Sequence, residues 1–380
     1  MQRRTDVDVL RGFALLGIGV VNLPYLALPI AAQLGPPPGA LDAAAYFLSK
    51  LLFEGKFFVL FSFLFGWGFG AQLASAERTG ASPRRRYLAR LIALALFGVL
   101  HALLVFQGDI LLAYACLGLL LWPLREASPR RLLHIAAAML PVSALAFALL
   151  YTEPAGVEDL VALGLDPDSR GYLGGYGQAV AQRLADWPFA LAVVVLFNGP
   201  LAFAAFCLGL AAFRTGFLEA DSAAFQQLTR RVPLLLCLAI PANLLFALAQ
   251  SGWLPESLPL RALAASALAL GAPSLGALYL WLVIRHAPRL RALGAAGAMP
   301  LTGYVLQGVL AGALFHGWGL GVFGTLGHAG LLASAVLIWV TVAVLAAAWR
   351  RYRDQGPLDA ALRRLVRLLS GAAPPASSGR

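Results

Sequence analysis

Charged residues are scarce in this chain of 380 residues, because Asp, Glu, Lys and Arg together make up only 12% of it. Soluble globular proteins carry about 25% charged residues. This chain is instead 60% hydrophobic, with a mean hydropathy of +0.77, so too few polar side chains remain to cover a surface in water. The composition therefore excludes a soluble enzyme or a disordered scaffold and predicts an integral membrane protein.

Cysteine is scarce too, and the three cysteines all lie in apolar runs without CxxC or Cys/His spacing. Neither a disulfide framework nor a metal site is predicted. P-loop, dinucleotide-binding, HExxH and GxSxG patterns are absent from the sequence. The chain has 18 acidic and 29 basic residues. In a soluble chain this excess of basic residues would suggest nucleic-acid binding. Here the arginines flank apolar runs, which indicates charge retained in cytoplasmic loops and no nucleic-acid partner.

Long apolar runs are what the chain has in abundance. A helix that crosses a bilayer needs about 20 mostly apolar residues, so the sequence predicts an all-α membrane bundle of about ten transmembrane helices around a polar cavity. The predicted spans are 10–32, 57–76, 88–106, 109–124, 132–151, 188–213, 233–250, 259–284, 296–317 and 326–349. Residues 41–53 are apolar but short, and we expect them to lie in the membrane interface. Because Asp6, Asp8 and Arg11 interrupt the first run, we expect it to be an uncleaved span rather than a signal peptide.

The basic residues orient these spans. In the ten-span arrangement nearly all lysines and arginines fall on one side of the membrane. The exceptions are Lys50, Lys56, Arg170, Arg183 and Arg261. Since cytoplasmic loops retain Lys and Arg, both termini are predicted to be cytoplasmic.

Residues 1–370 are predicted to form one transmembrane domain with two segments outside the spans. Residues 152–186 are polar and glycine-rich, and we expect this outer segment to cover an outward-facing cavity. Residues 356–370 place leucines on one helical face and arginines on another, which predicts a helix on the surface of the inner leaflet. Residues 371–380 are predicted to be disordered.

Polar side chains inside apolar spans are costly in lipid, so they mark candidate sites. A predicted turn at Gln107 and Gly108 brings His101 and Asp109 together near the outer third of the membrane. A carboxylate beside an imidazole fixes its tautomer and raises its basicity, as a general base requires. A purely structural buried pair is the alternative. The other four histidines are interpreted as interfacial residues.

Further polar residues accompany this pair. Asp8 and Arg11 are three residues apart and can pair at the inner mouth of the first span. Asn22 lies toward the outer half of that span, where its amide could bind a substrate or join two helices. The remaining candidates for lining the cavity or binding substrate are Lys56, Ser62, Tyr114, Asn198, Thr302, Tyr304 and Gln307. Lys56 could equally snorkel to the interface, and the glycines of the FGWGFG stretch favour close helix packing.

Five motifs resemble, in order, the YeiB-like family of bacterial inner-membrane proteins, a domain of unknown function. They are DVDVLRGFALLGIGVVN, KFFVLFSFLFGWGFG, GVLHALLVFQGDILLAYACLG, PLTGYVLQ and RYRDQGPLDAALRRL. The resemblance covers essentially the whole chain and implies a multi-pass protein of the bacterial inner membrane.

That family is similar to a superfamily of membrane acyltransferases that includes the heparan-glucosaminide N-acetyltransferase. The first span of that enzyme has an Asp-x-x-Arg-Gly opening and an outer Asn, which match Asp8, Arg11, Gly12 and Asn22. The resemblance implies that acyl-CoA enters from the cytoplasm and that an acceptor hydroxyl or amine comes from outside. The catalytic His of that enzyme follows its first span, whereas the first His of this chain is His101.

Together these observations predict a transmembrane acyltransferase acting on a glycan or small-molecule acceptor, with acyl-CoA as donor and no metal. His101 would deprotonate the acceptor, Asp109 would orient His101, and Asn22 would stabilise the oxyanion. The candidate contacts for the CoA phosphates are Arg84, Arg85 and Arg86.

Two other functions stay open. The alternative is a transporter or flippase for a small metabolite or a lipid-linked sugar, in which the same polar residues would line a translocation path. A non-enzymatic partner subunit in envelope assembly is the third. The lipid bilayer is the expected surrounding, and the pattern is compatible with an oligomer.

Overall fold

The computed structural model describes residues 5–152, 156–219 and 222–371, and within these ranges the chain forms helices and connecting turns without a strand. The predicted disordered tail lies outside these residues, apart from Gly371. The helices are α1 (Thr5–Ala27), α2 (Ala40–Leu52), α3 (Lys56–Arg78), α4 (Pro83–Leu104), α5 (Leu111–Leu121), α6 (Pro129–Thr152), α7 (Val157–Ala162), α8 (Tyr176–Ala192), α9 (Gly199–Arg214), α10 (Ala223–Gln250), α11 (Leu258–Arg285), α12 (Gly294–Gly297), α13 (Pro300–Phe315), α14 (His328–Trp349) and α15 (Pro357–Ser370). Short turns of other helix types are η1 (Ile30–Gln33), η2 (Trp122–Leu124), η3 (Arg170–Leu173), η4 (Val193–Phe197) and η5 (Arg291–Leu293).

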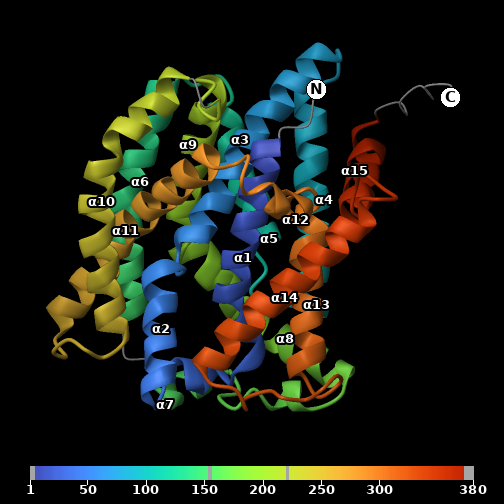
Figure 1. Cartoon of the computed structure of the whole chain (residues 1–380). Helices are drawn as coiled ribbons and strands as arrows, with labels where there is room; N and C mark the ends of the chain where they lie inside the picture. Colours follow the sequence, from blue (N-terminus) through green and yellow to red (C-terminus); the bar gives the residue numbers. More distant parts are fainter. Residues whose placement is uncertain (1–4, 153–155, 220–221, 372–380) are drawn as a thin grey trace.

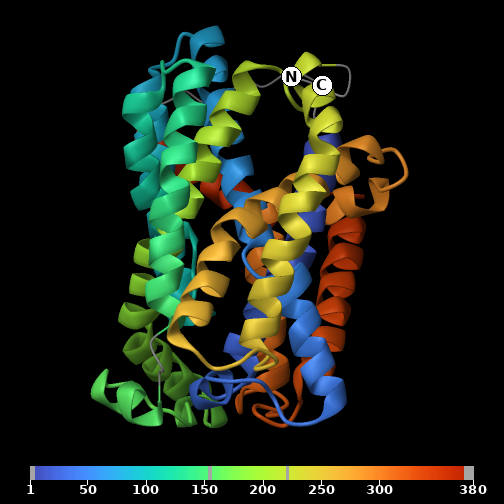
Figure 2. The same ribbon diagram turned by 90° about the vertical axis from the view of Figure 1, so that its left-hand side faces the viewer.

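The helices form a membrane bundle, as predicted. Among the described residues, eight helical stretches are long and apolar enough to cross a bilayer. The bent pair Arg291–Gly297 and Pro300–Phe315, which turns by 81°, makes a ninth if it is one span. In α6 and α10 only 28% and 22% of the apolar window is buried inside the protein. These two helices flank α11 along one side of the bundle (Figure 2), where they present apolar side chains to lipid.

The spans predicted at 109–124 and 188–213 do not each match one long helix. The span predicted at 109–124 is the short apolar helix Leu111–Leu124. The span predicted at 188–213 is divided, because a candidate span runs from Tyr176 to Phe197 and α9 follows as a separate, shorter helix. Pro200 lies in the first turn of α9, where its missing N–H breaks no helical hydrogen bond and favours a new helix start.

Residues 41–53, which are expected to lie in the membrane interface, form α2. This helix continues into α3 as one candidate span, Ala40–Arg78. The junction contains Gly55 with φ of 78°, a backbone conformation that glycine adopts without steric cost. α3 continues the helical stretch after this turn. α2 packs against α10 and α14 as part of the bundle.

The described chain ends share one end of the bundle. In Figure 1, α1 begins and α15 ends toward the top, while α7 and the connection between α13 and α14 lie at the bottom. This arrangement agrees with two termini on one side of the membrane. The assignment of that side to the cytoplasm rests on the distribution of arginine.

The predicted outer segment, residues 152–186, is partly helical. Residues 176–186 belong to α8, which begins the candidate span Tyr176–Phe197. Ahead of α8, the Tyr172 ring stacks on His316 with centroids 4.6 Å apart. Gly317 N donates to Tyr172 O at 2.8 Å. The segment thus packs over the end of α13 that lies at the bottom of Figure 1.

The buried core is centred on α3, whose two sides contribute to clusters with α1 and α11 and with α4, α5 and α9. Glycines allow α3 and α9 to cross at very close range. A Cβ on Gly66 would lie 2.0 Å from Phe206 O, and one on Gly209 would lie 2.0 Å from Phe63 O. No side chain fits there, so this part of the FGWGFG stretch serves helix packing.

Candidate functional site: a polar cavity at His101

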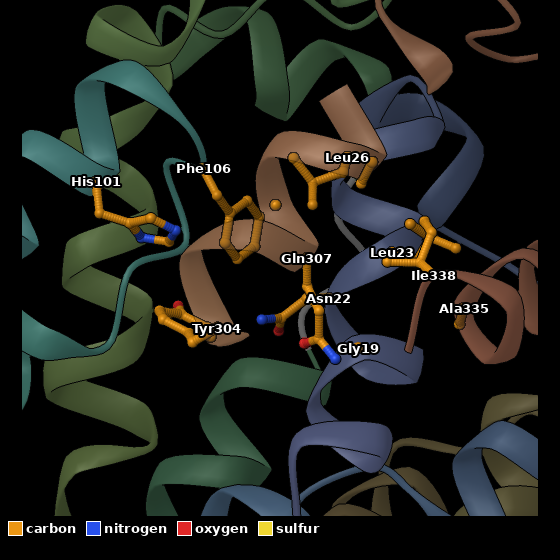
Figure 3. A pocket seen from close by; sticks show the side chains of 12 residues that line it. Gly19, Asn22, Leu23, Leu26, His101, Phe106, Tyr304, Gln307, Ala335 and Ile338 are labelled. Atoms are coloured by element: carbon orange, nitrogen blue, oxygen red, sulfur yellow. The ribbon is translucent and has the colours of Figure 1, made fainter. Parts of the chain in front are cut away.

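Four polar side chains from three helices meet around a small cavity (Figure 3). Asn22 comes from α1, His101 from α4, and Tyr304 and Gln307 from α13. The rest of the wall is mostly apolar, with contributions from α1, α13, α14 and Phe106. The volume of about 20 Å³ is enough for about one water molecule. We refer to this space as the His101 cavity.

His101 is held by Asp109. The distance between His101 Nδ1 and Asp109 Oδ1 is 2.9 Å, and both residues are buried, at 4% and 2% exposure. Asp109 Oδ2 accepts the backbone N–H groups of Leu111 at 2.7 Å and Leu112 at 3.0 Å, so the carboxylate also caps the start of α5. A carboxylate only accepts hydrogen bonds, hence Nδ1 carries the imidazole proton. In the neutral imidazole Nε2 is then the acceptor nitrogen, and within the described ranges it has no hydrogen-bond partner.

The opposite wall offers a hydroxyl and two amides. The Tyr304 ring lies 4.7 Å from the His101 ring, centroid to centroid, and its buried hydroxyl has no partner among the described residues. Gln307 Nε2 donates to Leu15 O at 3.1 Å and so fixes α13 against α1. The side chain of Asn22 lines the cavity close to Gln307 in Figure 3. Hydrogen-bond donors and acceptors from three helices thus face one common space with the imidazole of His101.

Two glycines that the sequence analysis did not single out, Gly98 and Gly308, leave room for the Asp109 carboxylate and for His101 Nε2. A Cβ on Gly98 would lie 2.7 Å from Asp109 Oδ2 and 2.5 Å from Leu112 N. A Cβ on Gly308 would lie 3.5 Å from His101 Nε2. Gly98 stands one helical turn before His101 in α4, and Gly308 directly follows Gln307. That spacing is the signal by which the sequence could have revealed them.

Several predicted residues lie away from the cavity. Ser62 Oγ and Tyr114 Oη are 2.7 Å apart between α3 and α5, where they join two helices. Lys56 is fully buried and donates from Nζ to Lys50 O at 2.8 Å. It lines neither the His101 cavity nor the surface, and its ammonium satisfies a carbonyl in the last turn of α2.

Asn198 and Thr302 are also placed elsewhere. Asn198 separates η4 from α9, and its Nδ2 donates to Val193 O at 3.5 Å. Thr302 stands in the first turn of α13, where its hydroxyl donates to Asp359 Oδ2 at 2.7 Å. Thr302 lines an apolar groove of about 610 Å³ between α13, α14 and the start of α15, on another face of α13 than the His101 cavity.

At the other end of the bundle, the structure pairs Arg11 with Asp8 at 3.3 Å, Nη1 to Oδ1. Arg84 and Arg85 are exposed, whereas Arg86 is half-buried and donates to Ser75 Oγ at 3.3 Å. Among the described residues, no group of three or more His, Cys, Asp and Glu side chains could hold a metal ion. Of the histidines interpreted as interfacial, His316 is fully buried within the protein, with Nε2 3.0 Å from Leu26 O.

A helical bundle with eight candidate spans among the described residues, and a small cavity among its helices, defines a multi-pass membrane protein. The comparison with known proteins then identifies its family. YeiB of Escherichia coli (strain K12), named as an uncharacterized protein, is 30% identical over 392 residues, covering 98% of this chain and 98% of that protein. The chain belongs to this YeiB-like family.

Other relatives agree. YxaH of Bacillus subtilis (strain 168), likewise named as uncharacterized, is 28% identical over 381 residues, which is 93% of this chain and 91% of that protein. An uncharacterized 39.9 kDa protein of Bacillus acidopullulyticus is 38% identical over 123 residues, or 32% of this chain and 34% of that protein. The family described as protein of unknown function (DUF418) matches residues 212–368, which include Tyr304 and Gln307. No solved structure matches the chain.

Proposed function

We propose that this protein is an acyltransferase of the bacterial inner membrane. It would move an acyl group from cytoplasmic acyl-CoA to a hydroxyl or amine of an extracytoplasmic glycan or small molecule. The observation that carries the proposal is His101 Nε2, which is buried and without a partner among the described residues. It faces a cavity while Asp109 holds the other ring nitrogen at 2.9 Å. The similarity of the opening motif to the acyltransferase superfamily supports the same reaction.

The transfer uses the cavity as follows. His101 Nε2 takes the proton of the acceptor hydroxyl or amine while the acceptor attacks the thioester carbon, and Asp109 stabilises the imidazolium. The oxyanion that forms accepts hydrogen bonds from the Asn22 amide and the Tyr304 hydroxyl, each worth about 3 kcal/mol in comparable sites. The C–S bond then breaks, and the CoA thiolate receives the proton from His101 Nε2.

The apolar wall supports this chemistry by excluding water. Leu23, Leu26 and Phe106 line the cavity beside the polar groups. Because the volume suffices for about one water molecule, substrates bind only after this wall has opened. A dry site also protects the thioester from hydrolysis.

Mass spectrometry of envelope glycans and lipids tests the proposal in cells with wild type, His101→Ala, His134→Ala or no protein. His134 is an exposed histidine on α6 and serves as the matched control. We expect an acylated product with wild type and His134→Ala, and none with His101→Ala or without the protein. Membrane fractions must hold equal amounts of each variant, since loss of His101→Ala protein would favour a structural pair.

Identical mass spectra of envelope glycans and lipids in all four strains would exclude the acyltransferase function. The transporter hypothesis makes a different forecast. It predicts no acylated product even with wild type, together with substrate uptake in proteoliposomes that depends on His101.

A further inference from the structure

Arg90 is an arginine inside a membrane helix without an acidic partner. It lies in the candidate span Pro83–Leu104 and forms no ion pair within the described ranges. Its guanidinium carbon stands 5.4 Å from the centre of the Phe65 ring. Intramembrane arginines are costly and are almost always paired or functional, so this position calls for an anion.

Two further arginines approach Arg90. Arg86 lies one helical turn earlier on the same face of α4, and Arg11 belongs to α1. Both are within electrostatic range of Arg90. Asp8 holds Arg11 at 3.3 Å, whereas Arg86, like Arg90, has no acidic partner among the described residues. Like charges at this range repel each other, and the repulsion persists unless an anion lies among them.

Next to Arg90, the surface of α3 carries no side chain at Gly68. Gly68 of α3 stands next to the guanidinium, and a Cβ at that position would lie 3.9 Å from both Nη atoms. The other glycines of this stretch, Gly66 and Gly70, are occupied by packing against Phe206 and Phe213 of α9. Gly68 therefore does not serve the α3–α9 crossing but leaves the face of α3 beside Arg90 without a side chain.

The site is also accessible from the end of the bundle. Arg86 is half-buried, and the side chain of Arg11 is 29% exposed. A ligand could therefore reach the three guanidinium groups from the side of the membrane where α1 begins. The exposed Arg84 and Arg85, by contrast, stay in solvent.

We propose that Arg11, Arg86 and Arg90 form a binding site for a phosphate group. The planar guanidinium fork matches the geometry of phosphate oxygens and binds them in a bidentate manner. The phosphate can be part of a soluble cytoplasmic compound or of an anionic lipid headgroup, and the experiment below separates the two sources.

The site lies at a distance from the His101 cavity. Arg90 and His101 are eleven residues apart in α4, which corresponds to about 16 Å along the helix axis. A soluble ligand bound here would extend along α4 toward His101 as the donor of the transfer. Only this extension rests on the proposed function. Phosphate binding itself does not.

Two binding measurements on the purified full-length protein test the site. In the first, thermal unfolding is followed with and without inorganic pyrophosphate. In the second, the protein is transferred from bilayers of phosphatidylglycerol or of phosphatidylcholine, and retained lipid is counted by native mass spectrometry. The variants are Arg90→Gln and Arg86→Gln. Arg131→Gln, an exposed arginine at the start of α6, is the matched control.

If the ligand is soluble, we expect pyrophosphate to raise the Tm of wild type and Arg131→Gln by several degrees. The Tm of Arg90→Gln and of Arg86→Gln should not change. For a lipid ligand, wild type and Arg131→Gln retain phosphatidylglycerol, and the two site variants lose it. Without any anion, Arg90→Gln should melt above wild type, because repulsion among the arginines is relieved.

The proposal would be overturned if wild type and both site variants showed the same change in Tm with pyrophosphate and retained the same amount of phosphatidylglycerol. It would also be overturned if Arg131→Gln lost these responses as fully as the site variants do. Arg86→Gln keeps the test valid if Arg90→Gln fails to fold, because Arg86 is only half-buried. His101→Ala should keep its full response to phosphate. Failure of this site and failure of the proposed transfer are therefore distinguishable.

Discussion

The chemistry open to His101 depends on which ring nitrogen carries the proton. Asp109 determines the tautomer, because its Oδ1 contacts His101 Nδ1. Its Oδ2 accepts the first N–H groups of α5. One carboxylate thus orients the base and caps a helix. The same contacts serve stability and catalysis, so only a substitution that preserves the cap can separate the two roles.

Asp109→Asn is such a substitution. The carboxamide oxygen still accepts from Leu111 and Leu112, but its NH₂ group donates to His101 Nδ1, which moves the imidazole proton to Nε2. We expect acyl transfer to fall by on the order of 10⁴, as for the same change in a comparable triad. The Tm should stay within a few degrees of wild type. Assays of transfer and of thermal unfolding on the same preparation check this, and unchanged transfer would show that Asp109 does not orient the base.

At the scale of elements, α13 connects the His101 cavity with the C-terminal helix. Its first turn is capped by Asp359 of α15, whose oxygens accept Leu301 N at 3.3 Å and Thr302 N at 3.1 Å. Thr302 Oγ1 also donates to Asp359 and accepts from Leu358 N at 3.1 Å. Tyr304 follows within one turn. The predicted surface helix is thus attached to a helix that lines the cavity.

Asp359→Ala should remove this attachment. Loss of a helix cap costs about 1–2 kcal/mol, and α15 should become susceptible to proteolysis while the bundle stays folded. Limited proteolysis and thermal unfolding measure both effects. Thr302→Ala should weaken the same contact, so the double variant should lose less stability than the sum of the two single losses. Strictly additive losses would contradict the coupled arrangement.

At the scale of the whole molecule, aromatic rings close the end of the bundle opposite the described chain ends. Tyr172 from the segment before α8 stacks on His316, and Phe323 packs against both. His316 follows the last residue of α13 and lies beyond that membrane segment. Burial, followed by the nearby charge of Arg183, lowers the pKa of His316 to about 4.

This shift predicts a stability that depends on pH. His316 is neutral in the folded protein and protonates more readily when unfolded, with a pKa near 6.5. The stability it contributes is therefore complete above pH 6.5 and is lost as the pH falls toward 4, by on the order of 3 kcal/mol. Thermal unfolding of wild type and His316→Gln between pH 4 and 8 measures it. The wild type should lose Tm more steeply below pH 6.5, and parallel curves would exclude His316 as the cause.

Much of the fold and part of the candidate site could be predicted from the sequence. Apolar runs of about 20 residues can only be helices in lipid, so the all-helical membrane bundle was determined locally. His101 and Asp109 are eight residues apart on either side of a short turn, and that proximity also followed from the chain itself. The motifs that resemble the YeiB-like family predicted the family membership that the comparison with known proteins confirmed.

Tertiary structure alone decided what surrounds those residues. The cavity combines Asn22, His101 and Tyr304 from α1, α4 and α13, and no local pattern states which faces of three distant helices will meet. Lys56 looked exposed because the sequence does not show how the Gly55 turn directs its ammonium to Lys50 O. Thr302 looked like a cavity residue because its partner Asp359 lies 57 residues away. Hydropathy determines which segments enter the membrane, whereas packing between distant segments determines where each polar side chain finds its partner.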